Sequence, residues 1–406
     1  MKEKAPLQTV LIAMTGGLES TVSAYLLKKQ GYHCIGIGIQ FFEPDSDTGP
    51  FADVIVSDLN KVKEICTYLD IPFYAVNASL LFSEKVLDPT VGRILSGHTF
   101  EPLVFLNYVV MEILLEKANK FNAKLIASGH YAKVLKNQKT GVFELMVAND
   151  LEQDQSYMLS ALEQKHLTHL ILPLSEIRKQ EVVKIGELIK VNYLKRPKAS
   201  IHHIMRDPRM ISLVEKRSSK DLRRPGTIFD YFTESSVCDH TGCHRFYIGQ
   251  KNIPSKMEPP IDPGKEVVLI IPFKGNVFID FPNRLKYQHV VVNYFKSADN
   301  LDTSLPLSVY VKMSTKGEKI PCLLYFKNNQ SCYVDFEVER PGLLVPGQMF
   351  VFYNRALEKG KVIGSGIVEV GGVFNNNQFN TLPEIKRNLD EKEESFIQND
   401  LDNISF

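Results

Sequence analysis

The chain has 406 residues, of which 44% are apolar and 23% are charged, and its formal net charge is +1. Its length predicts two to four globular domains, and the near-neutral charge excludes attraction of nucleic acid by an overall positive field, so any basic surface must be local. No apolar run approaches the ~18 residues of a membrane span, and six cysteines are too few for a disulfide scaffold, so we expect a cytoplasmic protein that does not bind a membrane.

Short β-rich runs alternate with helical patterns over the first 150 residues. The runs expected to form strands are VLIAM, CIGIGIQFF, PFYAVN and KLIASG, and the helices are expected at 20–30, 57–70 and about 103–121. This alternation is typical of an α/β domain with a parallel sheet, which binds ligands beyond the carboxyl ends of its strands.

A Gly-Gly pair flanked by hydroxyl residues, AMTGGLEST (13–21), follows the first expected strand and precedes the first helix. Two glycines allow a tight turn close to an anion, and the N–H groups that begin the helix favour phosphate. An ordinary strand-to-helix turn also favours these residue types. A second glycine turn at 128–131 follows another expected strand, and this coincidence favours phosphate binding. No G-x-x-x-x-G-K-[ST] sequence occurs, so a Walker-type loop is excluded.

From 151 to about 225 the pattern predicts helices, and 195–224 is locally basic. The basic residues there are Lys195, Arg196, Lys198, Arg206, Arg209, Lys216, Arg217, Lys220, Arg223 and Arg224, against three acidic ones, Asp207, Glu215 and Asp221. Such a stretch is usually a solvated surface. Its isolation in a near-neutral chain favours contact with a phosphate backbone.

The proline-rich stretch KMEPPIDPGK (256–265) predicts a linker, and alternating apolar runs beyond it predict an all-β region that ends near residue 372. The polar, acidic segment that follows lacks the apolar residues of a core, so we expect 374–406 to be disordered.

Five short motifs occur in register in this chain. AMTGGLESTV (13–22), SGHYA (128–132), DQSYML (154–159), HTG with IGQK (240–251) and PGQ with VFY (346–353) lie in that order. They resemble A-M-S-G-G-V-D-S-S-V, T-G-H-Y-A, D-Q-S-Y-F-L, H-x-G with I-G-Q-R, and P-G-Q-x-x-V-F-Y of the tRNA 2-thiouridylase (MnmA/TrmU) family. This family belongs to the PP-loop ATP-pyrophosphatases, and the resemblance covers roughly residues 8–370.

The resemblance implies an adenine-nucleotide alpha-hydrolase-like domain at 1–200, a small central tRNA-binding domain at 201–262 and a β-barrel domain at 263–373. It also implies the reaction: ATP, with Mg²⁺, activates C2 of the wobble uridine of tRNA, pyrophosphate leaves, and sulfur then displaces AMP. The implied partners are the anticodon arm of tRNA and, as a possibility, a sulfur-carrier protein, with no DNA.

The resemblance and the basic stretch together give the candidate site. ATP-binding residues are expected to be Ala13, Met14, Thr15, Gly16, Gly17, Leu18, Glu19, Ser20, Ile39 and Gly129. The tRNA-binding residues are expected to be His130, Asp154, Gln155, Arg223, Arg224 and Gln348. Glu19 is also a candidate catalytic residue. The alternative for His130 is a core histidine bonded to a backbone carbonyl.

The chain departs from the family at both catalytic cysteines. The family's T-P-N-P-D-V-M-C-N aligns with 99–107, so Leu106 stands in the place of the nucleophile. S-T-G-I-C-F aligns with 200–205 and puts Ile204 at the persulfide-carrying position, although one slip of register would put His203 there. Neither Leu nor Ile can carry or attack a sulfane sulfur. In the phosphate loop, Thr15 and Glu19 replace the family's Ser and Asp.

Other thiols could substitute only if they are reactive. Cys34, Cys66, Cys322 and Cys332 lie in apolar patterns and are expected to pack in cores. Cys238, His240, Cys243 and His244 lie within seven residues, but C-x4-C-H matches no strong zinc spacing, so no metal is expected. A metal site there and a relocated persulfide cysteine at Cys243 stay open as alternatives.

Two functions are compatible with these features. The first is an ATP-dependent tRNA 2-thiouridylase with altered sulfur delivery. The second is a catalytically deficient, tRNA-binding paralogue without sulfur transfer. Adenylation with a different nucleophile is a third possibility. The resemblance favours the enzyme, and the missing thiols argue against it.

Overall fold

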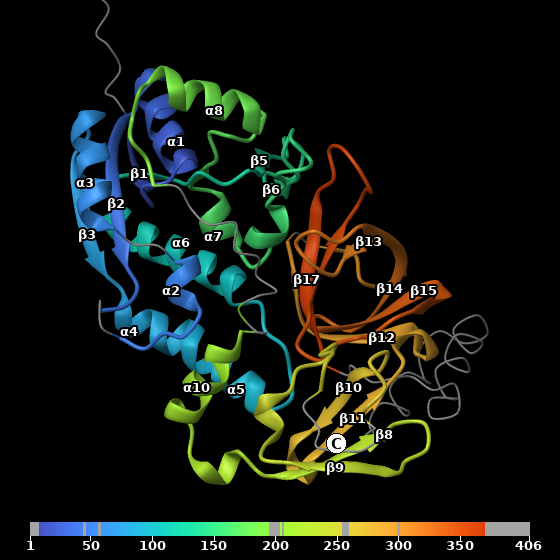
Figure 1. Cartoon of the computed structure of the whole chain (residues 1–406). Coiled ribbons are helices and arrows are strands. Elements are labelled where there is room, and N and C mark those ends of the chain that lie inside the picture. Colours follow the sequence, from blue (N-terminus) through green and yellow to red (C-terminus); the bar gives the residue numbers. More distant parts are fainter. Residues whose placement is uncertain are drawn as a thin grey trace, which may run out of the picture.

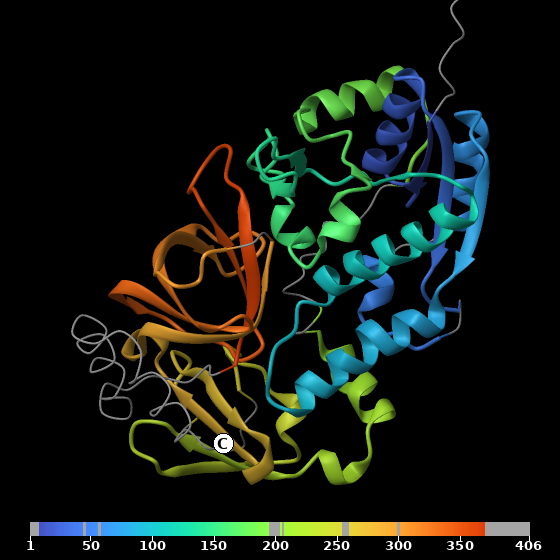
Figure 2. The same ribbon diagram turned by 180° about the vertical axis from the view of Figure 1, so that it is seen from behind.

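The computed structural model describes residues 8–43, 46–55, 58–194, 204, 207–253, 260–298 and 301–369. An α/β domain, a small four-stranded sheet and a closed barrel lie side by side in both views (Figures 1 and 2). The expected fold class is confirmed. The expectation of disorder at 374–406, and the basic residues Lys195, Arg196, Lys198 and Arg206, fall outside the described residues.

The α/β domain contains a five-stranded parallel sheet. The order is β3 (Phe73–Asn77), β2 (His33–Gln40), β1 (Thr9–Ala13), β4 (Leu125–Ala127) and β7 (Leu170–Ile171). Residues 10–13 of β1 are buried, as expected for the central strand of a sheet covered on both faces. From β1 the chain continues to β2 on one side, whereas β4 pairs on the other. Both glycine turns therefore lie beyond adjacent strands at the point where the strand order reverses, where such sheets bind ligands.

The three helices expected in this domain are present. They are α1 (Leu18–Lys29), α3 (Leu59–Tyr68) and α6 (Pro102–Lys120). Helix α6 begins with Pro102, and proline is common at the first position of a helix. The other helices are α2 (Phe51–Val54), α4 (Ser79–Phe82), a π-helix (Ser83–Leu87), α5 (Asp88–Leu95), α7 (Gln164–Leu167), α8 (Lys179–Leu188) and α10 (Pro208–Arg217). Within the described residues, no helix is both long and apolar enough to cross a membrane.

The expectation of helix throughout 151–225 is wrong for its first part. This segment contains a 3₁₀-helix (Ser156–Leu159), the one-turn α7 and strand β7. Tertiary contacts override the helical pattern there. The buried Tyr157 hydroxyl donates to the carbonyl of Met349 (3.0 Å), and the Ser156 hydroxyl lies 3.0 Å from that of Tyr353. Both partners belong to the barrel, so this segment joins two domains.

The central sheet has the order β10 (Glu266–Ile271), β11 (Asn276–Asp280), β8 (Gly226–Asp230) and β9 (Ser236–His240). The expected domain boundary at 262/263 lies between β9 and β10 in the sequence, so it would divide this one sheet between two domains. We therefore propose that the central domain extends to Asp280, with the barrel beginning at β12.

The closed barrel consists of β12 (Lys286–Ser297), β15 (Ser331–Pro341), β14 (Lys319–Asn328), β13 (Leu307–Lys312), β16 (Met349–Tyr353) and β17 (Val362–Val368), in that order around the ring. Alternate residues of β16 pack on opposite faces. Phe350 and Phe352 belong to the barrel core, whereas Met349, Val351 and Tyr353 belong to the core of the α/β domain. The barrel is thereby anchored to the first domain.

Candidate functional site

The loop after β1 presents the beginning of α1 to a ligand. Gly16 has φ +75°, a conformation that favours glycine. The Ser20 hydroxyl donates to the carbonyl of Gly17 (3.1 Å) and accepts from the Thr15 N–H (3.3 Å), which holds the loop in shape. Gly17 is the N-cap of α1, and no side chain caps this helix. The first N–H groups of α1 are therefore available to an anion.

The second glycine turn packs directly on this loop. A Cβ at Gly129 would lie 2.8 Å from the carbonyl carbon of Glu19 and 2.9 Å from the nitrogen of Ser20, so only glycine permits this approach. Gln155 fixes the turn, because its side-chain carbonyl accepts from the Tyr131 N–H (2.9 Å) and its own N–H donates to the Tyr131 carbonyl (2.7 Å).

A cavity of about 300 Å³ lies between these turns and α6, and we call it the nucleotide pocket. Its volume is at the lower end of the range for small-molecule sites. Of the sequence-predicted residues, it is lined by Ala13, Met14, Thr15, Glu19, Ser20, Ile39, Gly129, His130, Gln155 and Leu106. Gly16, Gly17 and Leu18 are outside the lining, and Leu18 instead packs in the core against Gly186.

Two residues that the sequence did not single out contribute to this site. Lys179, at the beginning of α8, forms an ion pair with Glu19. The Tyr131 hydroxyl is buried and has no hydrogen-bond partner among the described residues, although it belongs to a pocket-lining residue. A buried hydroxyl without a partner is costly, and a ligand that accepts a hydrogen bond from it would relieve that cost. Tyr131 was visible in the SGHYA motif, whereas Lys179 had no local signal.

Leu106 and Ile204 belong to one apolar cluster. Leu106 lies on α6 and lines the nucleotide pocket, while Ile204 is buried in the same core together with Met210 and Leu213 of α10. Segments almost 100 residues apart in sequence therefore contribute to one extended core, and of the two side chains only Leu106 lines the pocket. That core offers hydrocarbon and no thiol.

The cysteines expected to pack in cores are buried, namely Cys34, Cys66, Cys322 and Cys332. Burial raises the pKa of the Cys34 thiol to about 11 and that of Cys66 to about 12. Cys243 is buried too, in the core of the central sheet, and desolvation raises its pKa to about 11. Sulfur transfer requires a thiolate, and none of these cysteines lines the nucleotide pocket. This placement argues against Cys243 as a relocated sulfur carrier.

Both ring nitrogens of His240, whose Nε2 lies 3.8 Å from Cys243 Sγ, are hydrogen-bonded to backbone groups. His240 Nδ1 accepts from the Gly242 N–H, and Nε2 donates to the carbonyl of Gly275, both at 3.0 Å. Throughout the part of the chain that the structure describes, no group of three or more His, Cys, Asp or Glu residues is arranged to hold a metal ion.

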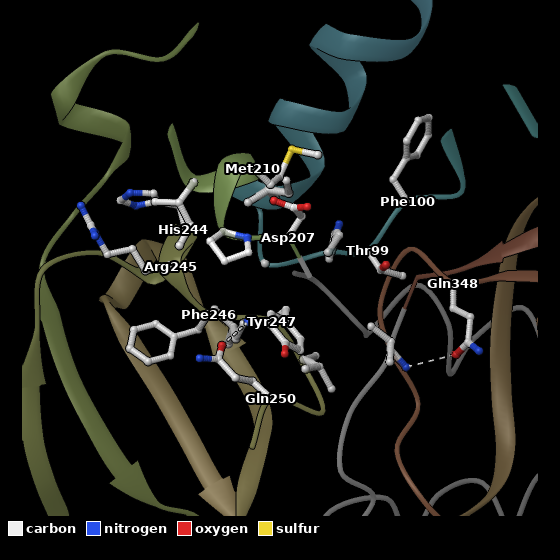
Figure 3. A pocket seen from close by; sticks show the side chains of 18 of the residues that line it. Thr99, Phe100, Asp207, Met210, His244, Arg245, Phe246, Tyr247, Gln250 and Gln348 are labelled. Atoms are coloured by element: carbon white, nitrogen blue, oxygen red, sulfur yellow. Dashed lines mark hydrogen bonds between the residues drawn. The ribbon is translucent and has the colours of Figure 1, made fainter. Parts of the chain in front are cut away.

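A second cavity, of about 350 Å³, lies where the three domains meet, and we call it the junction pocket (Figure 3). The 97–101 loop, the start of α10, residues 244–251 and the barrel residue Gln348 line it. Gln348 is engaged within the barrel: its amide donates to the Met313 carbonyl (2.8 Å) and its oxygen accepts from the Val345 N–H (3.4 Å). Binding of tRNA by Gln348 would have to replace these bonds.

Two other residues expected to bind tRNA, Asp154 and His130, have polar partners within the chain. Asp154 lines neither pocket, and its carboxylate accepts from the Ala148 N–H (3.0 Å) and the Ser156 hydroxyl (2.7 Å). It therefore shapes the turn that joins the first domain to the barrel. His130 does line the nucleotide pocket, with Nδ1 2.9 Å from the Ser128 hydroxyl.

The basic stretch is only partly available to a ligand. Arg209 pairs with Asp53 and Asp207, Lys216 pairs with Asp47, and Arg217 pairs with Asp88. Arg223 and Arg224 instead donate to backbone carbonyls, those of Ser219 and Phe273, each at 3.3 Å. Among the described residues of this stretch, positive charge without an ion-pair partner thus lies at its end, around Arg224.

Glu101 lies in the wall of the junction pocket and is only 8% exposed. Burial raises the pKa of its carboxyl from 4.5 to about 7, and a hydrogen bond with Tyr157 works in the opposite direction. The Tyr157 hydroxyl donates its single proton to the Met349 carbonyl. Of the two effects on the Glu101 pKa, burial is the larger.

We expect Glu101 to make stability depend on pH. The folded chain keeps this proton up to about pH 7, whereas the unfolded chain releases it near pH 4.5. The contribution of Glu101 to the free energy of unfolding should therefore fall between these pH values, by roughly 3 kcal/mol, and change no further above about pH 7. Glu101→Gln should match the unmodified chain at pH 4 and be more stable at pH 8. Urea unfolding at both pH values measures this, with exposed Glu358→Gln as control; an unchanged fall in the Glu101→Gln variant would contradict it.

The chain matches known proteins along most of its length. Residues 8–202 match the tRNA methyl transferase HUP domain, and residues 287–368 match the aminomethyltransferase beta-barrel domain. It is 31% identical over 371 residues to the tRNA-specific 2-thiouridylase MnmA 2 of Thermoanaerobacter sp. (strain X514), covering 89% of this chain and 97% of that one. It is 27% identical over 373 residues to the tRNA-specific 2-thiouridylase MnmA of Clostridioides difficile (strain 630), covering 89% and 98%.

Proposed function

The chain belongs to the tRNA-specific 2-thiouridylase (MnmA) family, and from this premise we propose that it binds ATP with Mg²⁺ in the nucleotide pocket and activates the wobble uridine of tRNA for 2-thiolation. One observation carries the proposal. A single pocket brings together the phosphate loop, the second glycine turn and the aligned position of the catalytic cysteine, Leu106.

The residues of this pocket fit a nucleotide. The uncapped beginning of α1 and the glycine loop suit a phosphate, and the unpartnered Tyr131 hydroxyl offers a hydrogen bond. Glu19 is the carboxylate available to a magnesium ion, and its ion pair with Lys179 would then be exchanged for contacts to metal and phosphate. Bound ATP supplies the adenylyl group that turns the C2 oxygen of uridine into a leaving group.

Sulfur delivery must differ from a relay between two cysteines, because Leu106 and Ile204 hold those positions. The chemistry that this pocket permits is direct attack on C2 by an external sulfur nucleophile, either hydrosulfide or the terminal sulfur of a persulfide on a carrier protein. The C2–S bond forms, the C2–O bond breaks, and AMP leaves with that oxygen. With a carrier persulfide, a reducing thiol must then cleave the S–S bond between the transferred sulfur and the carrier, which leaves that sulfur on uridine and the carrier in a disulfide with the thiol.

The replacement of both thiols by buried hydrocarbon specifically favours the second function, a tRNA-binding paralogue without sulfur transfer. The decisive experiment incubates unmodified tRNA with the chain, ATP and Mg²⁺, with a persulfide donor or with sulfide. Nucleoside mass spectrometry measures 2-thiouridine, and pyrophosphate is measured in the same tubes. Thiouridine supports the enzyme. Pyrophosphate without thiouridine indicates an adenylating enzyme with another nucleophile, and neither product indicates the binding protein.

Neutralising Arg223 and Arg224 should weaken the salt dependence of tRNA binding. Each lost phosphate contact should reduce the slope of log affinity against log salt concentration by roughly 0.7 to 0.9. The measurement is fluorescence anisotropy of labelled tRNA over a salt series for the Arg223→Gln, Arg224→Gln variant. The control is Lys63→Gln, Lys184→Gln, which removes two exposed charges from α3 and α8 of the first domain. Equal slopes for the two variants would make the arginines part of a solvated surface only.

A further inference from the structure

Phe273 is an exposed aromatic ring on a rigid turn. It lies between β10 and β11, and 72% of its surface is exposed. Gly275, with φ +70°, closes the turn by donating to the Pro272 carbonyl (3.0 Å). The carbonyl of Gly275 accepts from the Thr227 N–H (3.1 Å) and from His240 Nε2 (3.0 Å). The backbone that carries Phe273 is therefore held from two neighbouring strands, so little order is lost when a ligand stacks on the ring.

Two cations flank this ring. Arg224 donates to the carbonyl of Phe273 itself (3.3 Å), and the Lys274 ammonium lies 5.8 Å from the ring centroid. Both side chains are exposed, and among the described residues neither has a carboxylate within ion-pair distance. If the ligand of this surface were an apolar protein patch, the two cations would have no partners in the complex. A nucleotide offers both matching groups, a base for the ring and a phosphate for the cations.

The position of the turn connects it to the nucleotide pocket. A Cβ at Gly97 would lie 3.1 Å from both the Ile270 carbonyl oxygen and Pro272 Cδ, so the 97–101 loop packs against the base of the turn. From Gly97 the chain runs directly into α6 and reaches Leu106, which lines the nucleotide pocket. Nine residues of chain span at most roughly 30 Å, so the loop that packs against the turn lies within that distance of Leu106, a separation that one RNA arm can cover.

We infer that Phe273, Arg224 and Lys274 form a stacking platform for an unpaired nucleotide of the bound tRNA, with the base on the phenyl ring and the adjoining phosphates at the two cations. This inference rests on the proposed function for the identity of the RNA, and it adds a contact outside the reaction pocket. We call this surface the Phe273 platform.

The same sheet provides a matched control. Phe232, beyond the opposite end of β8, is 71% exposed, and the Arg284 guanidinium lies 5.2 Å from its ring centroid. Arg284, however, pairs with Asp280 (3.3 Å). The exposed fraction is thus nearly equal at the two phenylalanines, whereas the cation beside Phe232 has a counter-ion. Loss of exposed apolar surface alone would affect both positions equally.

The test compares Phe273→Leu with Phe232→Leu by fluorescence anisotropy of labelled tRNA at constant salt. We expect Phe273→Leu to weaken binding by about tenfold, Phe232→Leu by less than about twofold, and Phe273→Trp to retain affinity, because stacking needs an aromatic face rather than apolar bulk. The slope of log affinity against log salt should stay unchanged in Phe273→Leu, since no charge is removed.

Equal affinities of the two leucine variants would overturn the platform while leaving the proposed function intact, because the unmodified chain would still bind tRNA. Failure of the unmodified chain to bind tRNA at all would overturn both. The alternative occupant of this surface is a second copy of the chain, and sedimentation of the free protein tests for it. Self-association that Phe273→Leu abolishes would assign the surface to that second copy and overturn the RNA platform.

Discussion

A Gly17→Val variant is expected to fold normally and to bind ATP at least about 100-fold more weakly. Gly17 has φ −80° and ψ 170°, which any residue adopts, so the substitution introduces no backbone strain. A branched side chain at this N-cap would obstruct the approach of phosphate to the first N–H groups of α1. Loss of two charge-assisted hydrogen bonds, each about 1.5 to 3 kcal/mol, accounts for this factor. Titration calorimetry with ATP and Mg²⁺ measures it.

Substitution of the neighbouring Gly16 would not test ATP binding separately from stability. Gly16 has φ +75°, and a Cβ there would lie 2.8 Å from Leu194 Cδ1, so Gly16→Val should lower stability as well as binding. A suitable control is Gly92→Val on α5, where a Cβ meets nothing within 4 Å. Unchanged ATP affinity in a folded Gly17→Val protein would remove this loop from the nucleotide site.

The second large effect is expected from restoring both thiols. The Leu106→Cys, Ile204→Cys variant should form 2-thiouridine from a persulfide donor roughly 100-fold faster than the unmodified chain, a typical contribution of one positioned catalytic group. Both positions belong to one extended core, and Leu106 lines the nucleotide pocket, so this variant tests whether a thiol at each aligned position is the missing component. Thiouridine formation is measured by nucleoside mass spectrometry.

The matched control is Leu106→Ala, Ile204→Ala, which enlarges the same space without supplying sulfur. Any activity of the unmodified chain should be indifferent to Ser substitution of the buried cysteines Cys34, Cys66, Cys322 and Cys332. Activity that disappears in one of these Ser variants would show that a thiol we place in a core takes part in transfer. A gain in the Ala variant as large as in the Cys variant would attribute the effect to space rather than to chemistry.

Local patterns in the chain were enough to predict the strands and helices around the phosphate loop. Strand β1 is buried and apolar from Val10 to Ala13. Glycine at 16 follows from a positive φ, and glycine at 129 follows from close packing against the backbone of Glu19 and Ser20. Because carboxyl ends of parallel strands meet at one edge, two turns more than 100 residues apart could be assigned to one site before their contact was known. Five motifs in register identified the family, and the comparisons confirm it.

Features that depend on partners distant in sequence could not be predicted in this way. Ser156 and Tyr157 have a helical local pattern, but their side chains bond to the barrel almost 200 residues away, and these contacts outweigh helix propensity. From the sequence alone, Arg209 and Arg217 belong to a basic stretch with few acidic neighbours. In the folded chain Arg209 pairs with Asp53, and Arg217 pairs with Asp88. Coulomb attraction and desolvation depend on distance in space and on burial. Folding therefore determines which described basic side chains have an ion-pair partner, and burial raises the pKa of Glu101.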